Sequence, residues 1–171
     1  LYELYKATNN KEKLQKILRS LFLSMRTFNI ELYNEYKSYF SSDEWKTEIE
    51  SLLQESSRFE FEILYEEKMY DDLFVAVEKV YNKYGGIYYI KEYAAVLLPK
   101  YSNQLAEMFV KALEKNIENL RNRDDYRCFA KDLKFLAKNL NALEKASELR
   151  QKWLVEYKRK SALCEELRWA F

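Results

Sequence analysis

Apolar side chains recur every three or four residues along almost the whole chain, and no stretch alternates apolar and polar positions as a half-buried strand does. This period is typical of amphipathic helices that turn one apolar face toward a core. The pattern predicts helices at about residues 11–26, 30–40, 42–55, 59–67, 69–84, 87–98, 102–120, 126–140 and 143–157, and a last short helix from about Ser161.

Residue types predict where several of these helices begin and end. Gly85 stands where a left-handed C-terminal cap is needed, and Gly86 helps the chain to turn. The helix that follows must stop at or before Leu98, because Pro99 disfavours helical geometry in the residue before it. Capping residues with the spacing of a helix N-terminus are Asn9 with Glu12 and Ser41 with Glu44, and turns are predicted near Glu67 and Lys68 and at Asn141.

Short connections between consecutive helices favour antiparallel neighbours. The windows 63–84 and 126–157 resemble each other in pattern, and both carry alanines that let helix backbones approach closely. No strict repeat length emerges, so any repeat is degenerate. We therefore predict an all-α fold of stacked antiparallel helical hairpins, a short TPR-like or HEAT-like α-solenoid, with residues 1–171 as a single helical-repeat domain.

Composition removes most catalytic schemes. The chain has two Gly, one Pro and no His, so it lacks the turn residues of a sandwich or barrel and the imidazole of a Ser-His triad or His-bearing zinc site. The Gly85-Gly86 pair lacks the Lys-Ser/Thr of a phosphate loop. We predict no catalytic residue, no cofactor and no metal site.

Cysteine content and the chain start bear on location. Cys128 and Cys164 each lie inside a helical pattern and are expected to be reduced thiols that act as small hydrophobes, as in a cytoplasmic protein. No apolar run is long enough to cross a bilayer, and no signal peptide is visible, so no membrane partner is expected. Because the chain begins at Leu1 rather than Met, we expect a fragment of a longer intracellular protein.

The formal net charge of +1 is the sum of two unlike regions. Residues 43–72 hold eleven acids and three bases, a net charge of −8, whereas residues 100–171 hold sixteen bases and eleven acids, a net charge of +5. Opposed fields of this kind orient a partner or drive head-to-tail association. The alternative interpretation is a set of solvated helix faces with charge pairs one turn apart.

Four cations share one predicted helix face. They are Arg127, Lys131, Lys134 and Lys138, at spacings of four, three and four. Such a basic face fits phosphates or an acidic partner. The intervening Asp132 and the low net charge favour the alternative, a solvated face without a ligand.

Tyrosine is the other unusual feature, with fifteen in the chain. Five of them crowd one helix end and the start of the next helix: Tyr81, Tyr84, Tyr88, Tyr89 and Tyr93. Tyrosine is enriched at protein interfaces, where its ring packs and its hydroxyl finds a partner. These residues therefore predict either an aromatic groove for a protein partner or half-buried seams between stacked helices.

The stretch from about Trp45 to Phe171 resembles the helical region that follows the zinc finger in bacterial SWIM zinc-finger proteins. The resemblance is carried by Glu-Glu-Lys-Met-Tyr-Asp-Asp at 66–72, Leu97-Leu98-Pro99, Asn122-Arg123-Asp124-Asp125-Tyr126, and Arg159-Lys160-Ser161-Ala162-Leu163 with Glu165, Glu166 and Leu167. It implies a helical-repeat fold and a finger upstream. The Cys-x-Cys and Cys-x-His pairs of that finger do not occur in this chain, so no metal site or nucleic-acid role is carried over.

Together these features predict a non-catalytic protein–protein interaction or scaffold module of a larger intracellular protein. The alternative is a nucleic-acid-associated module that uses the basic helix face. An enzyme fragment with carboxylate chemistry ranks last, because the acids fall mostly on polar faces and turns, where nothing separates their pKa values.

Overall fold

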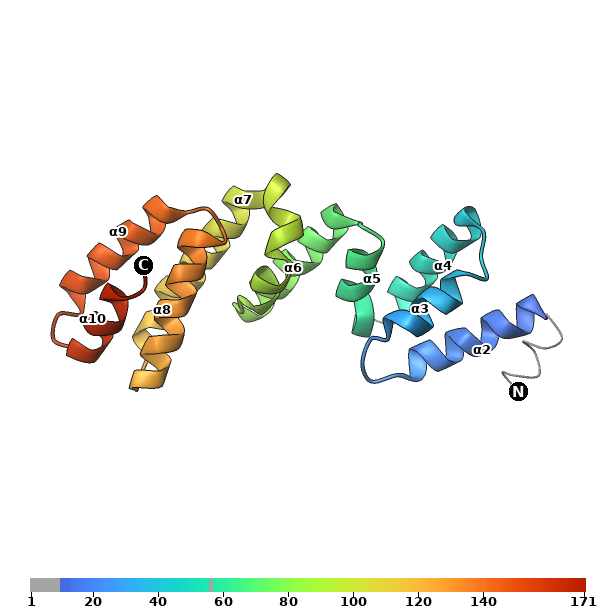
Figure 1. Cartoon of the computed structure of the whole chain (residues 1–171), viewed down its shortest axis with the longest axis horizontal. Helices are drawn as coiled ribbons and strands as arrows, with labels where there is room; N and C mark the ends of the chain where they lie inside the picture. Colours follow the sequence, from blue (N-terminus) through green and yellow to red (C-terminus); the bar gives the residue numbers. More distant parts are fainter. Residues whose placement is uncertain (1–9, 56) are drawn as a thin grey trace. The chain divides into compact units, whose positions relative to one another are not determined.

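The computed structural model of this chain describes residues 10–55 and 57–171, and the predicted all-α class is confirmed (Figure 1). All secondary structure in these residues is helical, and none of them lies in a strand. Contacts along the chain group it into two compact units, Leu1–Met69 and Tyr70–Phe171. The solenoid subtype and the single domain stay predictions.

The first unit contains four α-helices and a 3-10 turn in its described part: α2 (Lys11–Ser24), α3 (Ile30–Lys37), α4 (Ser42–Glu55), η1 (Ser57–Phe59) and α5 (Glu60–Glu66). Its core combines aliphatic side chains with a group of aromatic rings. Phe22 lies 5.5 Å from Tyr33 and 5.2 Å from Phe59 between ring centroids, and Trp45 lies 5.4 Å from Tyr33 and 5.6 Å from Tyr36. The tilted and edge-on rings are the arrangements that the aromatic quadrupole favours.

The second unit contains α6 (Tyr70–Tyr84), α7 (Tyr88–Asn116), η2 (Ile117–Asn119), α8 (Arg123–Lys138), α9 (Leu143–Glu156) and α10 (Ser161–Arg168). Helices that follow one another pack on one another, and α8 contacts α7, α9 and α10 (Figure 1). Its apolar stripe is buried, with Phe129 5.1 Å from Trp153 between ring centroids and Leu133 and Leu136 fully enclosed.

The predicted break between helices 87–98 and 102–120 is present as a kink, but it lies at Tyr101 and not at or before Leu98, so the predicted stop is wrong by three residues. Helix α7 continues through Pro99, and the backbone leaves helical geometry only at Tyr101, with φ −120° and ψ 21°. Contacts with α6 hold the residue at the kink. The ring of Tyr101 stacks on Phe74 at 3.9 Å, and its hydroxyl donates a 2.7 Å hydrogen bond to Asp71.

The predicted cap at the start of α4 is confirmed. The Ser41 amide donates to the Glu44 carboxylate at 2.8 Å, and the Glu44 amide donates to the Ser41 hydroxyl at 3.4 Å. At the start of α2 the cap is Asn10, whose side chain accepts from the Lys13 amide at 3.2 Å. Asn9, where a cap was predicted, lies outside the described residues.

Three predicted turns are confirmed by backbone geometry. Lys68, Gly85 and Asn141 have φ values of 56°, 69° and 52°, the left-handed conformation that closes a helix. At Gly85 the amide also donates a 2.6 Å hydrogen bond to the carbonyl of Tyr81, which satisfies one carbonyl in the last turn of α6.

We expect Gly85→Ala to destabilise the protein by about 1 kcal/mol, because an L side chain resists a positive φ. A Cβ at this position would make only an ordinary 3.7 Å contact, with the Lys115 ammonium, so the backbone alone causes the loss. Gly86→Ala is the matched control, since a Cβ there meets no atom within 4 Å. Urea unfolding checks both variants, and an equal loss in the two would contradict the expectation.

Candidate functional site

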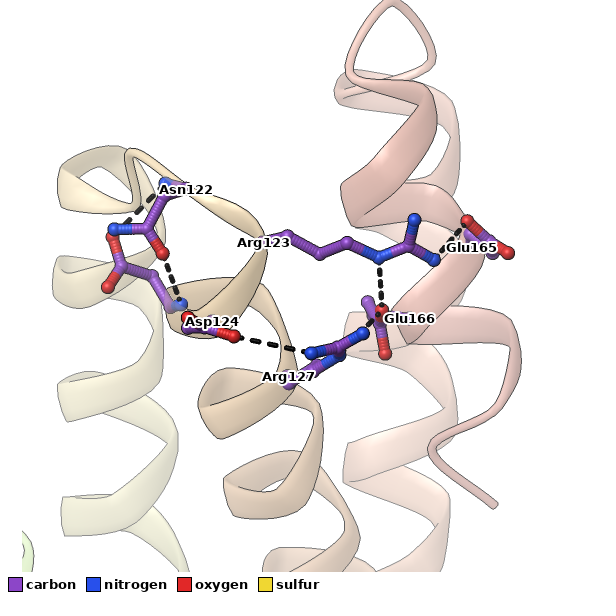
Figure 2. Close-up of polar contacts among 7 residues, drawn as sticks. Asn122, Arg123, Asp124, Arg127, Glu165 and Glu166 are labelled. Carbon is purple, nitrogen blue, oxygen red and sulfur yellow. Dashed lines mark hydrogen bonds and ion pairs between the residues drawn. The ribbon is translucent and has the colours of Figure 1, made fainter.

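The N-terminus of α8 is fixed by a reciprocal cap. The Asn122 side chain accepts from the Asp125 amide at 2.9 Å, and the Asp125 carboxylate accepts from the Asn122 amide at 3.2 Å (Figure 2). Hydrogen bonds from the Arg121 and Asn122 amides hold the pKa of the Asp125 carboxyl below its usual value. The cap thereby sets where the helix begins.

One of the four cations of the predicted basic face, Arg127, is engaged in ion pairs. Arg127 contacts Asp124 at 3.3 Å and Glu166 of α10 at 3.5 Å (Figure 2). Arg123 contacts the same Glu166 at 3.1 Å and Glu165 at 2.7 Å, so both guanidinium groups link α8 to α10. Arg127 therefore serves packing between two helices.

The other three cations, Lys131, Lys134 and Lys138, are exposed. Within the part of the chain that the structure describes, none of them forms an ion pair or a side-chain hydrogen bond. In the sequence, the presence of Asp132 among these lysines argues against a basic face. In the structure Asp132 forms an ion pair with Lys91 of α7 and is turned toward that helix. We call Lys131, Lys134 and Lys138 the lysine row.

The five tyrosines of the predicted groove differ in solvent exposure. Tyr93 is buried, Tyr81 and Tyr89 are half-buried, and Tyr84 and Tyr88 are 68% and 66% exposed. Burial raises the pKa of Tyr81. The inner rings are thus wholly or partly covered by the rest of the chain, whereas Tyr84 and Tyr88 stand at the surface. We call this exposed pair the tyrosine pair.

The tyrosine pair borders the α6–α7 turn and is flanked by cations. The Tyr88 ring meets Tyr89 edge-on at 5.2 Å, and Tyr89 in turn stacks on Tyr93 at 6.4 Å. The Lys83 ammonium lies 5.0 Å from the centre of the Tyr84 ring, and the Lys115 ammonium lies beside Gly85. This surface can offer aromatic rings next to positive charge.

Sequence reasoning missed a carboxylate cluster in the first unit. Glu67, only 11% exposed at its side chain, accepts hydrogen bonds from the Tyr33 hydroxyl at 2.8 Å, the Trp45 indole at 3.1 Å and the Lys37 ammonium at 2.9 Å. The partners are far away in sequence, so no local spacing signals them. The one local indication of this cluster is that Glu67 lies in the turn after α5.

The cluster around Glu67 suits a structural tie better than acid–base chemistry. Burial alone would raise the pKa of this carboxyl, but hydrogen bonds from Lys37, Tyr33 and Trp45 outweigh it and hold the pKa below 4.5. A general acid needs the opposite shift. Glu67 therefore holds the polar tips of an aromatic core.

The described residues offer neither a metal site nor a membrane span. No group of three His, Cys, Asp or Glu side chains among them is placed to hold a metal ion. Nor does any helix in this part of the chain combine the length and apolar character needed to cross a membrane.

Comparisons with known proteins found no match: no family model matches the sequence, and neither a curated protein nor a solved structure matches the chain. The resemblance to the helical region of SWIM zinc-finger proteins stays a prediction.

We expect Glu166→Gln to lower the thermal unfolding midpoint by a few degrees, because Glu166 is only 17% exposed at its side chain and pairs with two arginines. Glu165→Gln is the neighbouring control, and it should change the midpoint less, since the Arg123–Glu165 pair is half-exposed on both sides. Calorimetry measures both midpoints, and a larger loss from Glu165→Gln would refute this account of the α8–α10 contact.

Glu67→Gln should destabilise the first unit by about 2 kcal/mol at neutral pH, because three donors lose a charged acceptor. The pKa of Glu67 is lower in the folded chain, so its contribution is full above pH 4.5 and is lost as pH falls through the folded pKa. The difference between the two proteins should therefore shrink on acidification. Hydrogen exchange of amides in α3 to α5 against pH measures it, with exposed Glu66→Gln as the control that should stay near zero.

Proposed function

We propose that this chain is a non-catalytic protein–protein interaction module of a larger intracellular protein, and that it contacts its partner through the tyrosine pair. The observation that carries the proposal is the exposure of Tyr84 and Tyr88, at 68% and 66%, on either side of a tight turn. Large aromatic side chains of this kind supply much of the energy of protein interfaces.

Local structure restrains part of the tyrosine pair before any partner binds. Gly85 fixes the end of α6 with its left-handed backbone, and Tyr88 rests edge-on against the half-buried Tyr89. A preorganised aromatic surface loses less conformational freedom on association than a mobile one. This supports a binding role over the alternative of two incidental surface tyrosines.

The charge beside the tyrosine pair indicates the chemistry of the partner. Lys83 and Lys115 are both exposed cations, and they lie near Tyr84 and Gly85 respectively. Complementary charge gives specificity and speeds association. The partner segment should therefore carry an apolar or aromatic side chain for the rings, next to one or more carboxylates.

Two less specific elements belong to the same proposal. Cys128 and Cys164 are both free thiols, which supports a reducing, cytoplasmic setting. Cys164 is buried as a small hydrophobe, whereas Cys128 is exposed, so the prediction of a buried thiol is wrong for Cys128. The resemblance to the helical region of SWIM zinc-finger proteins supports a place within a longer chain.

Site-directed photo-crosslinking tests the proposal. The crosslinking residue p-benzoylphenylalanine replaces Tyr84 or Tyr88 in cells, and replaces Val75 as the control, since Val75 is 59% exposed on the same α6. We expect one and the same protein, identified by mass spectrometry, to crosslink at Tyr84 and Tyr88 but not at Val75, with or without nuclease.

Once the partner is identified and purified, its affinity for wild-type and variant chains is measured. Tyr84→Ser with Tyr88→Ser should weaken binding at least tenfold without changing the unfolding midpoint, because both rings are exposed. Crosslinks that are identical at all three positions, or that disappear after nuclease treatment, would refute the proposal.

A further inference from the structure

We infer that the lysine row on α8 is a second, separate binding surface, which contacts the phosphate backbone of a nucleic acid without reading its sequence. Lys131, Lys134 and Lys138 carry this inference. At 100° per residue they fall within about 60° of one another around the helix axis, and at 1.5 Å per residue they span about 10 Å along it. Successive phosphates of one strand advance about 3.4 Å along a duplex, so the row covers several of them.

The helix is oriented so that the lysine row faces away from the rest of its unit. The buried side of α8 is formed by Phe129, Ala130, Leu133, Leu136 and Ala137. Ion pairs fix the rotation at two points, with Arg123 and Arg127 bound to α10 and Asp132 bound to Lys91 of α7. The three lysines are exposed on the side opposite the buried residues, and Arg127 lies on the same side one turn nearer the helix N-terminus, where it reaches Glu166.

The charge of the lysine row is not neutralised by neighbours. Each acid of α8 is already engaged: Asp124 with Arg127, Asp125 in the helix cap, and Asp132 with Lys91. The second unit, Tyr70–Phe171, contains nineteen bases and fifteen acids, a net charge of +4. A polyanion approaching this face therefore meets uncompensated positive charge.

The composition of the face favours a nucleic acid over an acidic protein. A protein interface has a core from which charged residues are depleted and in which apolar and aromatic side chains are enriched. Among the described residues of the second unit, the exposed large hydrophobic side chains lie outside α8, at Val75, Tyr84, Tyr88, Leu143, Val155 and Trp169. A polar, positively charged face without an apolar anchor matches the interfaces that proteins form with nucleic acids.

Backbone contacts of this kind have a defined salt dependence. Each phosphate neutralised on a single strand contributes about −0.7 to the slope of log K against log salt, so three lysines give a slope of about −2. Affinity should then fall roughly twentyfold between 50 and 200 mM NaCl. Sequence should matter little, because no base is read.

Fluorescence anisotropy with a labelled oligothymidylate of about 20 nucleotides tests the inference. The row variant is Lys131→Glu, Lys134→Glu and Lys138→Glu together. The matched control is Lys79→Glu, Lys111→Glu and Lys158→Glu, which changes the net charge equally at three other exposed lysines that form no ion pair among the described residues. We expect the row variant to bind at least tenfold more weakly than wild type at 50 mM NaCl, and the control to stay within threefold.

Three outcomes would overturn the inference. They are no binding by the wild-type protein at 50 mM NaCl, equal losses in the two variants, and labelled poly-glutamate bound as tightly as the oligonucleotide, which would assign the row to an acidic protein. If the glutamate variant fails to fold, the same three positions are changed to Gln, which removes the charge without adding repulsion. Because the tyrosine pair shares no residue with the lysine row, crosslinking at Tyr84 is unaffected by either result.

Discussion

The second unit depends above all on the burial of one face of α8. Phe129, Leu133 and Leu136 are enclosed by the helices around α8, and removing such large side chains from water is the main favourable term in folding. This burial fixes the rotation of the helix and so decides which of its polar residues meet solvent. The exposure of Lys131, Lys134 and Lys138 is therefore a consequence of packing on the opposite side.

Ion pairs at the edge of this core add to the packing that orients α8. Glu166 binds Arg123 and Arg127 from α8, and Lys91 binds Asp132, so the charges nearest to neighbouring helices are matched in pairs. Charges farther from the neighbours are left for solvent or for a ligand. The same logic applies in the first unit, where the polar tips of Tyr33 and Trp45 reach one carboxylate, Glu67, because a buried donor without an acceptor is costly.

The two proposed surfaces differ in chemistry, and the difference follows from where each lies. The tyrosine pair stands at a turn whose rings lead inward through Tyr89 to the buried Tyr93, so apolar area and rigidity are available there. The lysine row stands on a helix face with no large apolar side chain exposed. One surface suits a protein segment and the other a phosphate backbone, and each exists without the other.

The sequence by itself determined most of the helices, the left-handed cap at Gly85, the places of the turns near Lys68 and at Asn141, and the cap at Ser41. These features depend on residues within one or two turns of one another. Spacing also placed the cations of α8 on one face. Only the tertiary structure decided which of those cations are free, which tyrosines are exposed, that Glu67 ties an aromatic core, and that α7 continues past Pro99 with a kink at Tyr101. Each of these depends on a partner many residues away: Glu166 for Arg127, Lys91 for Asp132, and Phe74 for Tyr101. The tendency to form a helix or a turn depends on neighbouring residues, whereas burial and ion pairing depend on contacts that exist only once the chain has folded.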